Sequence, residues 1–517
     1  MMQPALLIDE IIRHIFYYSS EDGPSTLNAL ARSCKSWADP ALDLMWMRLS
    51  TITPLLYLIP GVRLDNGVYV LDSSIFPHDL LRFRVYASRV KYISHRRHIQ
   101  VHPDILSLLT DCNSARPHTE LLPSLLSAQL SSSACDTIQT SLSLSHQLRH
   151  VDLDLGFNSR NPKNFPAIIV SQYLEMVARI APELQRLSVR GSLSEDLLGT
   201  MSSMRNLRSL SLRAGSSLTT DAFLAIMNFQ NLAELELHAS HLDIDELSDT
   251  LPNQGQPILP ALKKLHMRAQ GPVLELVLGT LHTESLHTLD IEAEGHPVSW
   301  RPIFQAICSN AASTLENLTV EHHIELDEMD IDSGPSAAPP SHTTTTSELI
   351  PNTQIPSNDM LILTDLIHLR RLVLDTTIPP AIGDQELSTL ISRWPELEHL
   401  DLGSMPVSGC VRRRATPPLT LQSLVALATK SSKLTTLALP VDLQKVDDTE
   451  IPANTPNHSG LKRLTFGGPP PADPLQLARY LHRLFPSLME VDSISEDEEL
   501  WLSTQAALRT LCLPTTS

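Results

Sequence analysis

The feature that most constrains this chain is a hexapeptide that recurs with aliphatic residues at its first, fourth and sixth positions. It begins as LRHVDL at Leu148 and returns as LQRLSV at Leu184 and LRSLSL at Leu207. Several intervals between copies are 23 to 29 residues, and regular self-similarity of this length is typical of stacked repeats. The later copies are LAELEL at Leu232, LKKLHM at Leu262, LHTLDI at Leu286, LENLTV at Leu315, LRRLVL at Leu369, LEHLDL at Leu397, LTTLAL at Leu434 and LKRLTF at Leu461, followed by the weaker LMEVDS at Leu488 and LRTLCL at Leu508.

Helical patterns fill the intervals between these hexapeptides. Two examples are TDAFLAIMNFQN, from Thr220 to Asn231, and LQSLVALATKSSK, from Leu421 to Lys433. A short strand cannot bury its alternate leucines alone, whereas stacked strand-helix units share one continuous core. The pattern therefore predicts an α/β fold, a curved solenoid with parallel strands inside and helices outside. These units resemble leucine-rich repeats.

The N-terminal region has a different pattern. In LIDEIIRHIF, from Leu7 to Phe16, the apolar residues fall on one broad stripe of a helix. SSEDGP then interrupts the pattern, and two further apolar helical runs follow between Leu27 and Leu49. A helix of about ten residues is marginal alone in water. We therefore expect three short helices that share a small core.

These helices resemble the F-box, on the leucines, the Ile-Phe pair, the Cys-x-x-Trp and the closing Leu-Trp of that family. The sequence departs from the family at Ile8, where proline is usual. Segments 54–61 and 81–93 are also similar to the region after the F-box in proteins of mushroom-forming fungi. The resemblance implies binding to a Skp-type adaptor and, through it, to a cullin-RING ubiquitin ligase. The alternative is an unrelated helical bundle. The expected adaptor contacts are Leu7, Ile11, Ile12, Ile15, Phe16, Trp37 and Trp46.

Charge and cysteine content narrow the class of partner and the compartment. The net charge of −19 disfavours nucleic acids and anionic membranes, which need a positive surface. The basic residues of segment 82–97 alternate with apolar ones, so we interpret them as the solvated edge of a packed region. The six cysteines are scattered without a Cys-x-x-Cys pair, which favours reduced thiols. No signal peptide or spanning segment is predicted, so we expect a cytoplasmic or nuclear protein.

The boundaries follow from these patterns. We predict an F-box over 4–50, a helical or mixed connection over 51–147, and repeats over 148–324 and 360–513. Residues 325–359 are acidic and rich in Pro, Ser and Thr, which predicts a disordered loop. Three arginines precede Thr416-Pro417, which is compatible with a kinase site, although a plain exposed loop is favoured.

No motif for catalysis is present. The chain lacks a phosphate-binding glycine loop, a G-x-S-x-G elbow and an H-E-x-x-H sequence. His95, His98 and His102 have no accompanying cysteine or carboxylate motif, so no metal site is predicted there. His322 and His323 are expected on the solvated surface. We therefore expect a protein that is not an enzyme and that has no catalytic residue, no cofactor and no metal.

Residues between and just after the repeat leucines must point away from the core, toward the concave face. The earlier repeats carry mostly basic residues at these positions and the later repeats acidic ones. A surface of both signs suits a folded protein partner, whereas DNA needs one sign throughout; ordinary solvated strands are an equal alternative. The candidate substrate-binding residues are Arg186, Arg190, Arg213, Glu236, Lys264, His266, Arg268, Asp290, Glu292, Asp375 and Asp401.

Together, these patterns favour a non-catalytic, substrate-recruiting subunit of a Skp, cullin and F-box ubiquitin ligase. It would bind the adaptor through the F-box and an unknown target protein through the repeats. The alternative is a leucine-rich-repeat interaction scaffold with no role in ubiquitin transfer.

Overall fold

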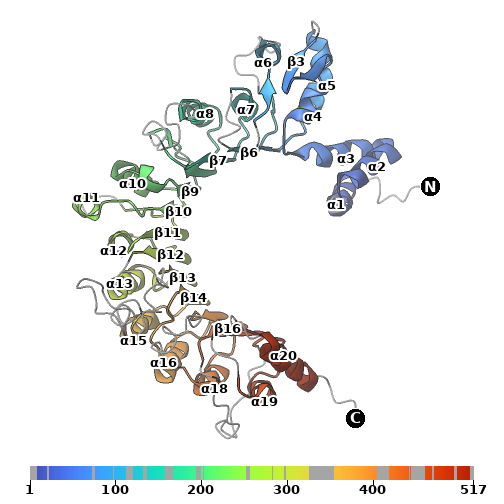
Figure 1. Ribbon diagram of the computed structural model, residues 1–517. Helices are drawn as coiled ribbons and strands as arrows, with labels where there is room; N and C mark the ends of the chain where they lie inside the picture. Colours follow the sequence, from blue (N-terminus) through green and yellow to red (C-terminus); the bar gives the residue numbers. More distant parts are fainter. Residues whose placement is uncertain are drawn as a thin grey trace, which may run out of the picture. The chain divides into compact units, whose positions relative to one another are not determined.

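The structure is a computed structural model of the 517-residue chain. It describes residues 8–19, 23–72, 76–96, 98–111, 120–131, 137–157, 167–193, 199–201, 203–251, 257–281, 283–295, 298–324, 354–403, 419–441, 443, 460–467, 471–493 and 498–512. The chain divides into two units, Met1–Asn231 and Leu232–Ser517. Figure 1 shows the order of the elements along the chain. Within the described ranges, no helix has the length and apolar character needed to cross a membrane.

The first unit begins with the three expected helices, α1 (Asp9–Ser19), α2 (Pro24–Ser33) and α3 (Lys35–Met47). Ile12, Phe16, Leu27 and Ala41 form their small buried core. The break between α2 and α3 lies at Cys34, whose backbone is extended, and α3 runs through Pro40. Proline usually ends a helix, so a break nearer Pro40 would have been expected.

A second, smaller sheet follows in the segment predicted as a connection. Strands β2 (Val62–Asp65) and β3 (Val68–Leu71) form an antiparallel hairpin, and β5 (Gln100–Val101) pairs with β3. Asn66 and Gly67 both have positive φ at the hairpin turn. Asn-Gly is a strong signal for such a two-residue turn. The helical elements of this region are α4 (Thr53–Leu56), η3 (Pro77–Leu80), α5 (Leu81–Ala87) and α6 (Pro103–Asp111).

The main sheet of the first unit is parallel, with the order β1-β4-β6-β7-β8-β9. Three of its strands precede Leu148, so the stacked units begin earlier than the predicted boundary. Those early strands lack the L-x-x-L-x-L pattern that marked the later repeats. The strands are β1 (Arg48–Leu49), β4 (Tyr92–His95), β6 (Ser127–Ser131), β7 (His150–Gly156), β8 (Arg186–Gly191) and β9 (Ser209–Arg213), and the associated helices are α7 (Thr137–Leu142), α8 (Ala167–Ile180), η5 (Gly215–Ser217) and α10 (Thr220–Met227).

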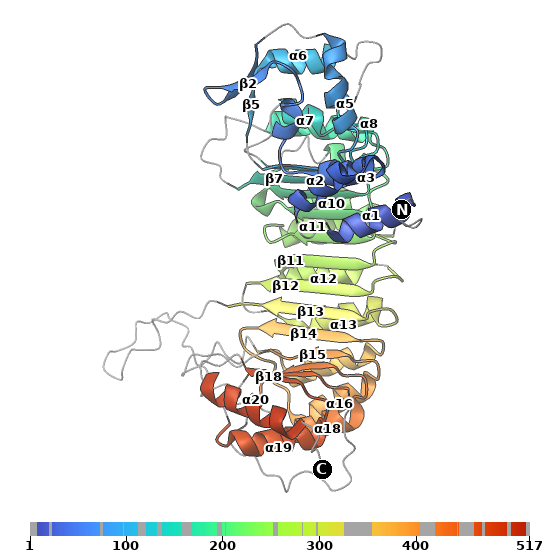
Figure 2. The same cartoon turned by 90° about the vertical axis from the view of Figure 1, so that its right-hand side faces the viewer.

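The second unit continues the same construction, with parallel strands in the order β10 to β18 and helices along one side of them (Figures 1 and 2). The strands are β10 (Glu234–His238), β11 (Lys264–Gln270), β12 (Thr288–Glu294), β13 (Asn317–His322), β14 (Arg371–Thr376), β15 (His399–Asp401), β16 (Thr436–Leu439), β17 (Arg463–Phe466) and β18 (Glu490–Ser493). The helices are α11 (Ile244–Thr250), α12 (Gly271–Thr280), α13 (Trp300–Ala311), α15 (Ser357–Met360), η8 (Leu361–Asp365), α16 (Asp384–Arg393), α18 (Leu421–Lys430), α19 (Pro474–Leu484) and α20 (Glu498–Cys512).

The strands bury every second side chain against the helices. Leu235 and Leu237 of β10 and Leu289 and Ile291 of β12 are all at most 2% exposed, while the residues between them are partly exposed. Paired strands lie about 4.8 Å apart and packed helices need about 8 to 10 Å, so each stack bends with its strands on the inner face. The predicted α/β repeat solenoid is confirmed.

Helix α20 follows strand β18. The interpretation of LRTLCL at Leu508 as a weak copy of the repeat was wrong. Trp501, Thr504 and Leu508 are buried at helical spacing, and α20 packs on α19 and β18. The Trp501 ring stacks on Phe466 at 5.4 Å between centroids.

Residues 354–359, the last part of the predicted disordered loop, lie within the described residues. Ile355 is 1% exposed, Pro356 forms a parallel β-bridge with Ala381, and helix α15 begins at Ser357. These residues support the next repeat. Segments 325–353 and 404–418, which include most of the predicted loop and the Thr416-Pro417 site, lie outside the described residues.

Two histidines occupy the core rather than the surface. His322 is 2% exposed, its Nε2 lies 3.1 Å from the carbonyl oxygen of Gly295, and it meets the Trp300 ring edge-on. Its predicted surface position was wrong, because the strand ends with its last side chain pointing inward. His323, the next residue, is exposed as expected. His95 is also 2% exposed, and its Nε2 has no hydrogen-bond partner within the described ranges.

Replacing either of two repeat leucines, Leu187→Ala or Leu210→Ala, should lower the free energy of unfolding by about 2 to 5 kcal/mol. Both side chains are 1% exposed, so each change leaves a cavity. Ser188→Ala, on the outward face of the same strand, should change stability by less than about 0.5 kcal/mol. Urea unfolding followed by circular dichroism measures both; equal effects at Leu187 and Ser188 would contradict the assigned facing of the strand.

Acid should destabilise the first unit through His95, because burial lowers the pKa of this imidazole to about 4. The unfolded chain, with a pKa near 6.5, binds the proton more readily. Stability is therefore complete above pH 6.5 and falls as the pH drops toward 4, by about 1.4 kcal/mol per pH unit. His95→Gln should flatten this dependence in urea unfolding measured from pH 7 to 5. An unchanged slope would show that the imidazole does not titrate on unfolding.

Candidate functional site

Helix α1 and the residue just before it carry an apolar stripe that their own module leaves uncovered. Ile8, Ile11 and Ile15 are 46%, 39% and 43% exposed, and their spacing places them along one side of the helix. Ion pairing and helical packing occupy other sides of α1. Exposed β-branched side chains in a row are costly in water, so we treat this row as a candidate docking surface. We call Ile8, Ile11 and Ile15 the isoleucine stripe.

The other predicted adaptor contacts lie elsewhere. Ile12 and Phe16 are each 3% exposed and face the three-helix core, so they support α1 and are not available for direct contact. Half-buried Trp37 meets Phe16 edge-on at 5.7 Å between ring centroids. Trp46 packs on Tyr86 of α5 at 4.6 Å, which joins the helical module to the following segment. Leu7 lies outside the described residues.

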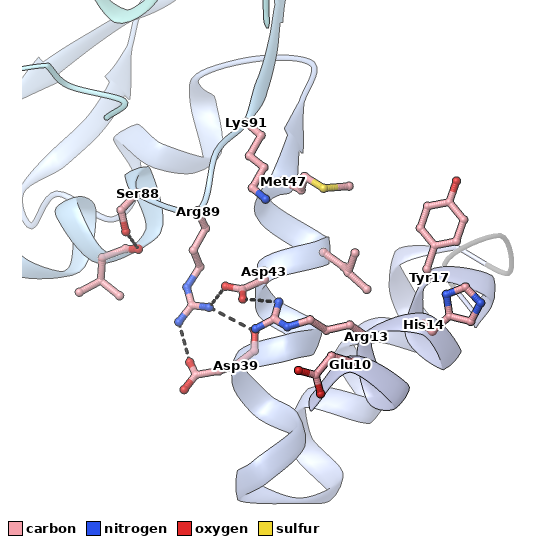
Figure 3. Close-up of a pocket in the computed structure, with 12 residues that line it drawn as sticks. Glu10, Arg13, His14, Tyr17, Asp39, Asp43, Met47, Ser88, Arg89 and Lys91 are labelled. Carbon is pink, nitrogen blue, oxygen red and sulfur yellow. Dashed lines mark hydrogen bonds and ion pairs between the residues drawn. The ribbon is translucent and has the colours of Figure 1, made fainter. Parts of the chain in front are cut away.

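A pocket of about 760 Å³ lies between α1, α3 and the segment after α5 (Figure 3). Asp43 lies at its centre between two guanidinium groups. Arg13 donates to Asp43 Oδ2 at 2.8 Å, and Arg89 donates to Asp43 Oδ1 and, at 2.6 Å, to Asp39. The remaining lining includes Glu10, His14, Tyr17, Leu44, Met47, Val85, Ser88 and Lys91.

This ion-pair network fixes the orientation of α1 and α3 relative to α5. The Arg89 side chain is only 15% exposed. Burial alone would lower its pKa, but hydrogen bonds and charge from Asp39 and Asp43 outweigh burial and raise it. An arginine of the predicted solvated edge is therefore a structural contact. The carboxylates that pair with Arg89 have their hydrogen bonds within the pocket. We therefore assign the pocket residues the role of holding α1, and with it the isoleucine stripe, in place.

In the first unit, the predicted arginines lie on the outward face of β8 and β9. Arg190 and Arg213 are aligned across the two strands, and Arg186 lies four residues before Arg190 on the same face. All three are exposed. Arg190 also lies 3.7 Å from Asp154 of β7 and 5.8 Å from the centre of the Phe157 ring. The three side chains form a basic patch that the sequence had predicted from the repeat positions.

In the second unit, strand register sorts the predicted polar residues into rows. One row runs Glu236, His266, Asp290. The next runs His238, Arg268, Glu292, Glu321, Asp375. Asp401 lies further along, where burial raises the pKa of its carboxyl.

These rows modify the predicted division into a basic and an acidic region. Arg268 lies 3.2 Å from Glu292 and also contacts Glu294, and Lys264 lies 3.9 Å from Asp290. The cations of β11 are therefore paired with the acids of β12. The aligned residues that follow on β12, β13 and β14, Glu292, Glu321 and Asp375, are all acidic. The basic patch on β8 and β9 also has an acidic neighbour, since Arg190 pairs with Asp154.

One cluster was missed by the sequence search. Glu236 and His238 of β10 and His266 of β11 bring their nitrogen and oxygen ligand atoms within 4.8 Å of one another. A search for short motifs cannot find such a set, because its members come from consecutive repeats. Alignment of LAELELH with LKKLHMR would have placed Glu236 and His266 at the same repeat position.

Comparison with known proteins finds no matching family model and no matching curated protein. Among solved structures, the chain is similar to an internalin (inlF) from Listeria monocytogenes, with 12% identity and a TM-score of 0.32, over 72% of this chain and 81% of the other. It is also similar to a chain in the complex of Rad7 and Elc1 in yeast, with 16% identity and a TM-score of 0.38, over 76% and 84%. Similarity this low carries no argument about function, so the description of the fold rests on the chain's own strand order and repeats.

Proposed function

We propose that this protein is the substrate-recruiting subunit of a ubiquitin ligase of the Skp, cullin and F-box type. The isoleucine stripe would bind the Skp-type adaptor, and the outward face of the repeat strands would bind the target. The chain itself would perform no chemistry; it would hold the target close to the ubiquitin-transferring subunits. The protein would act in the cytoplasm or nucleus.

The observation that carries this proposal is the two-sided apolar character of α1. Ile12 and Phe16, on one side of the helix, are buried in the core. The isoleucine stripe is 39% to 46% exposed. Burying an isoleucine side chain contributes about 1.5 to 3 kcal/mol. Three such side chains can supply much of the binding free energy of a micromolar complex. An apolar helical partner fits this surface, in agreement with the F-box resemblance of the same segment.

The repeat face supports the second half of the proposal. Its leucines are committed to the core, so its outward side chains can vary without loss of the fold. The arginines on β8 and β9 present positive charge in an otherwise acidic protein. An acidic segment of a target protein is the complementary partner.

The alternative function is an interaction scaffold that uses the same repeat face without ubiquitin transfer. In that case the three helices would stabilise the start of the sheet, through Trp46 and the Arg89 network, and bind no adaptor. Co-purification of the adaptor and the cullin with the full chain distinguishes these functions.

Changing the stripe with Ile11→Asp and Ile15→Asp should weaken adaptor binding by about 100-fold or more, since two buried side chains are lost. Both positions are exposed in the free chain, so melting temperature should stay close to that of the parent. Ile367→Asp, at a 43% exposed isoleucine of the second unit, is the matched control and should bind normally. Adaptor binding can be measured by co-purification and calorimetry.

Full adaptor binding by the folded double variant would reject the stripe as the docking site. Phe16→Ala provides a contrast, because this change should destabilise the module by about 3 to 5 kcal/mol.

Reversing the basic patch with Arg186→Glu, Arg190→Glu and Arg213→Glu should lower target capture and leave adaptor binding intact. The loss should appear mainly in the association rate and shrink with added salt, because charge complementarity steers encounter. Proximity labelling in cells with the proteasome blocked compares the captured proteins. An unchanged set of labelled and ubiquitinated proteins would show that this patch does not bind the target.

A further inference from the structure

We propose that Glu236, His238 and His266 form a binding site for a divalent transition-metal ion of the zinc type on the outward face of β10 and β11. The proposal rests on side-chain placement in the second unit. It is independent of the proposed ligase function.

Strand geometry brings the three side chains together. Glu236 and His266 are directly aligned across the parallel pair β10 and β11, and His238 lies two residues beyond Glu236 on the same face. Neighbouring strands are about 4.8 Å apart, and alternate residues share a face. The buried side chains of Leu235, Leu237 and Met267, each at most 2% exposed, prevent either strand from rotating. The outward direction of the three ligands is therefore fixed by the core.

The distances and ligand types suit a small transition-metal ion. The three ligand atoms lie within 4.8 Å of one another, and the two imidazole rings are 6.4 Å apart between centroids. Zinc bonds to nitrogen and carboxylate oxygen are about 2.0 to 2.2 Å, which requires ligand atoms roughly 3.5 Å apart. Small side-chain rotations close this difference without backbone movement. All three residues are half-buried, so an ion can enter from solvent.

The neighbouring charges also permit a cation. Arg268 is aligned with His238 and Lys264 lies two residues before His266, and either could repel a metal ion. Both point their charge toward β12, however. Arg268 contacts Glu292 and Glu294, and Lys264 approaches Asp290. Glu234, on the same face of β10 as Glu236, adds negative charge next to the site.

Two histidines and one carboxylate leave a coordination position to water, as in open zinc sites. Because this face points away from the repeat core, the open position faces solvent. A site of this kind can accept a further ligand from a bound molecule, such as an imidazole or a carboxylate.

The test is Zn²⁺ binding to the purified full chain after removal of metal with a chelator. Calorimetric titration of the parent should show one bound ion more than the Glu236→Gln or His266→Gln variants, or a site weakened in them by about tenfold or more. Glu236→Gln retains the side-chain size, so its fold is expected to persist. His368→Gln, at an exposed histidine of the same unit, is the control and should bind as the parent does.

A second measurement separates this site from other histidines of the chain. Zn²⁺ should raise the melting temperature of the parent and of the His368→Gln variant, because the ion binds the folded state. The rise should be smaller in the Glu236→Gln and His266→Gln variants. If these variants match the parent in stoichiometry, affinity and melting shift, or if the parent binds no Zn²⁺ at micromolar concentrations, the proposed site is wrong.

Discussion

The structure depends on mutual burial between neighbouring repeats. A strand such as β12 buries Leu289 and Ile291 only because β11, β13 and the adjoining helices cover them. No single repeat could offset the conformational entropy that is lost when its own residues become ordered. The same constraint keeps the parallel strands in register, since a slip by one residue would turn every leucine outward. Core packing therefore decides where each polar side chain of the outward face lies.

The three N-terminal helices are stabilised by fewer buried residues than the repeats. Their core of four buried side chains is small, and α1 gains additional support from Asp43, which pairs with arginines from α1 and from the segment after α5. Burial makes the loss of one partner of such a pair costly, because the remaining charge is left unpaired, and Arg89 is the most buried member. The isoleucine stripe is thus presented from a helix held on two sides.

The sequence predicted the architecture well because its signal is repeated many times. The L-x-x-L-x-L copies located most strands from β7 onward, and Leu421–Lys433 contained α18. The errors concern single positions where the pattern is short. His322 and His95 are each the last residue of a strand and point inward, and Leu508 belongs to a helix where a strand was predicted. The ion pairs of Arg89 and the cluster at Glu236 join distant sequence positions, so no local pattern contained them.

The in-register rows of the second unit have an evolutionary consequence. Each outward residue has two coordinates, its place along the strand and the number of its repeat, as in Glu236, His266 and Asp290. A duplication or loss of one whole repeat moves part of the surface by one step and leaves the rows aligned, whereas a one-residue insertion within a strand breaks them. Recognition can therefore change either by substitution at one point of this grid or by a change in repeat number, while the core pattern stays the same.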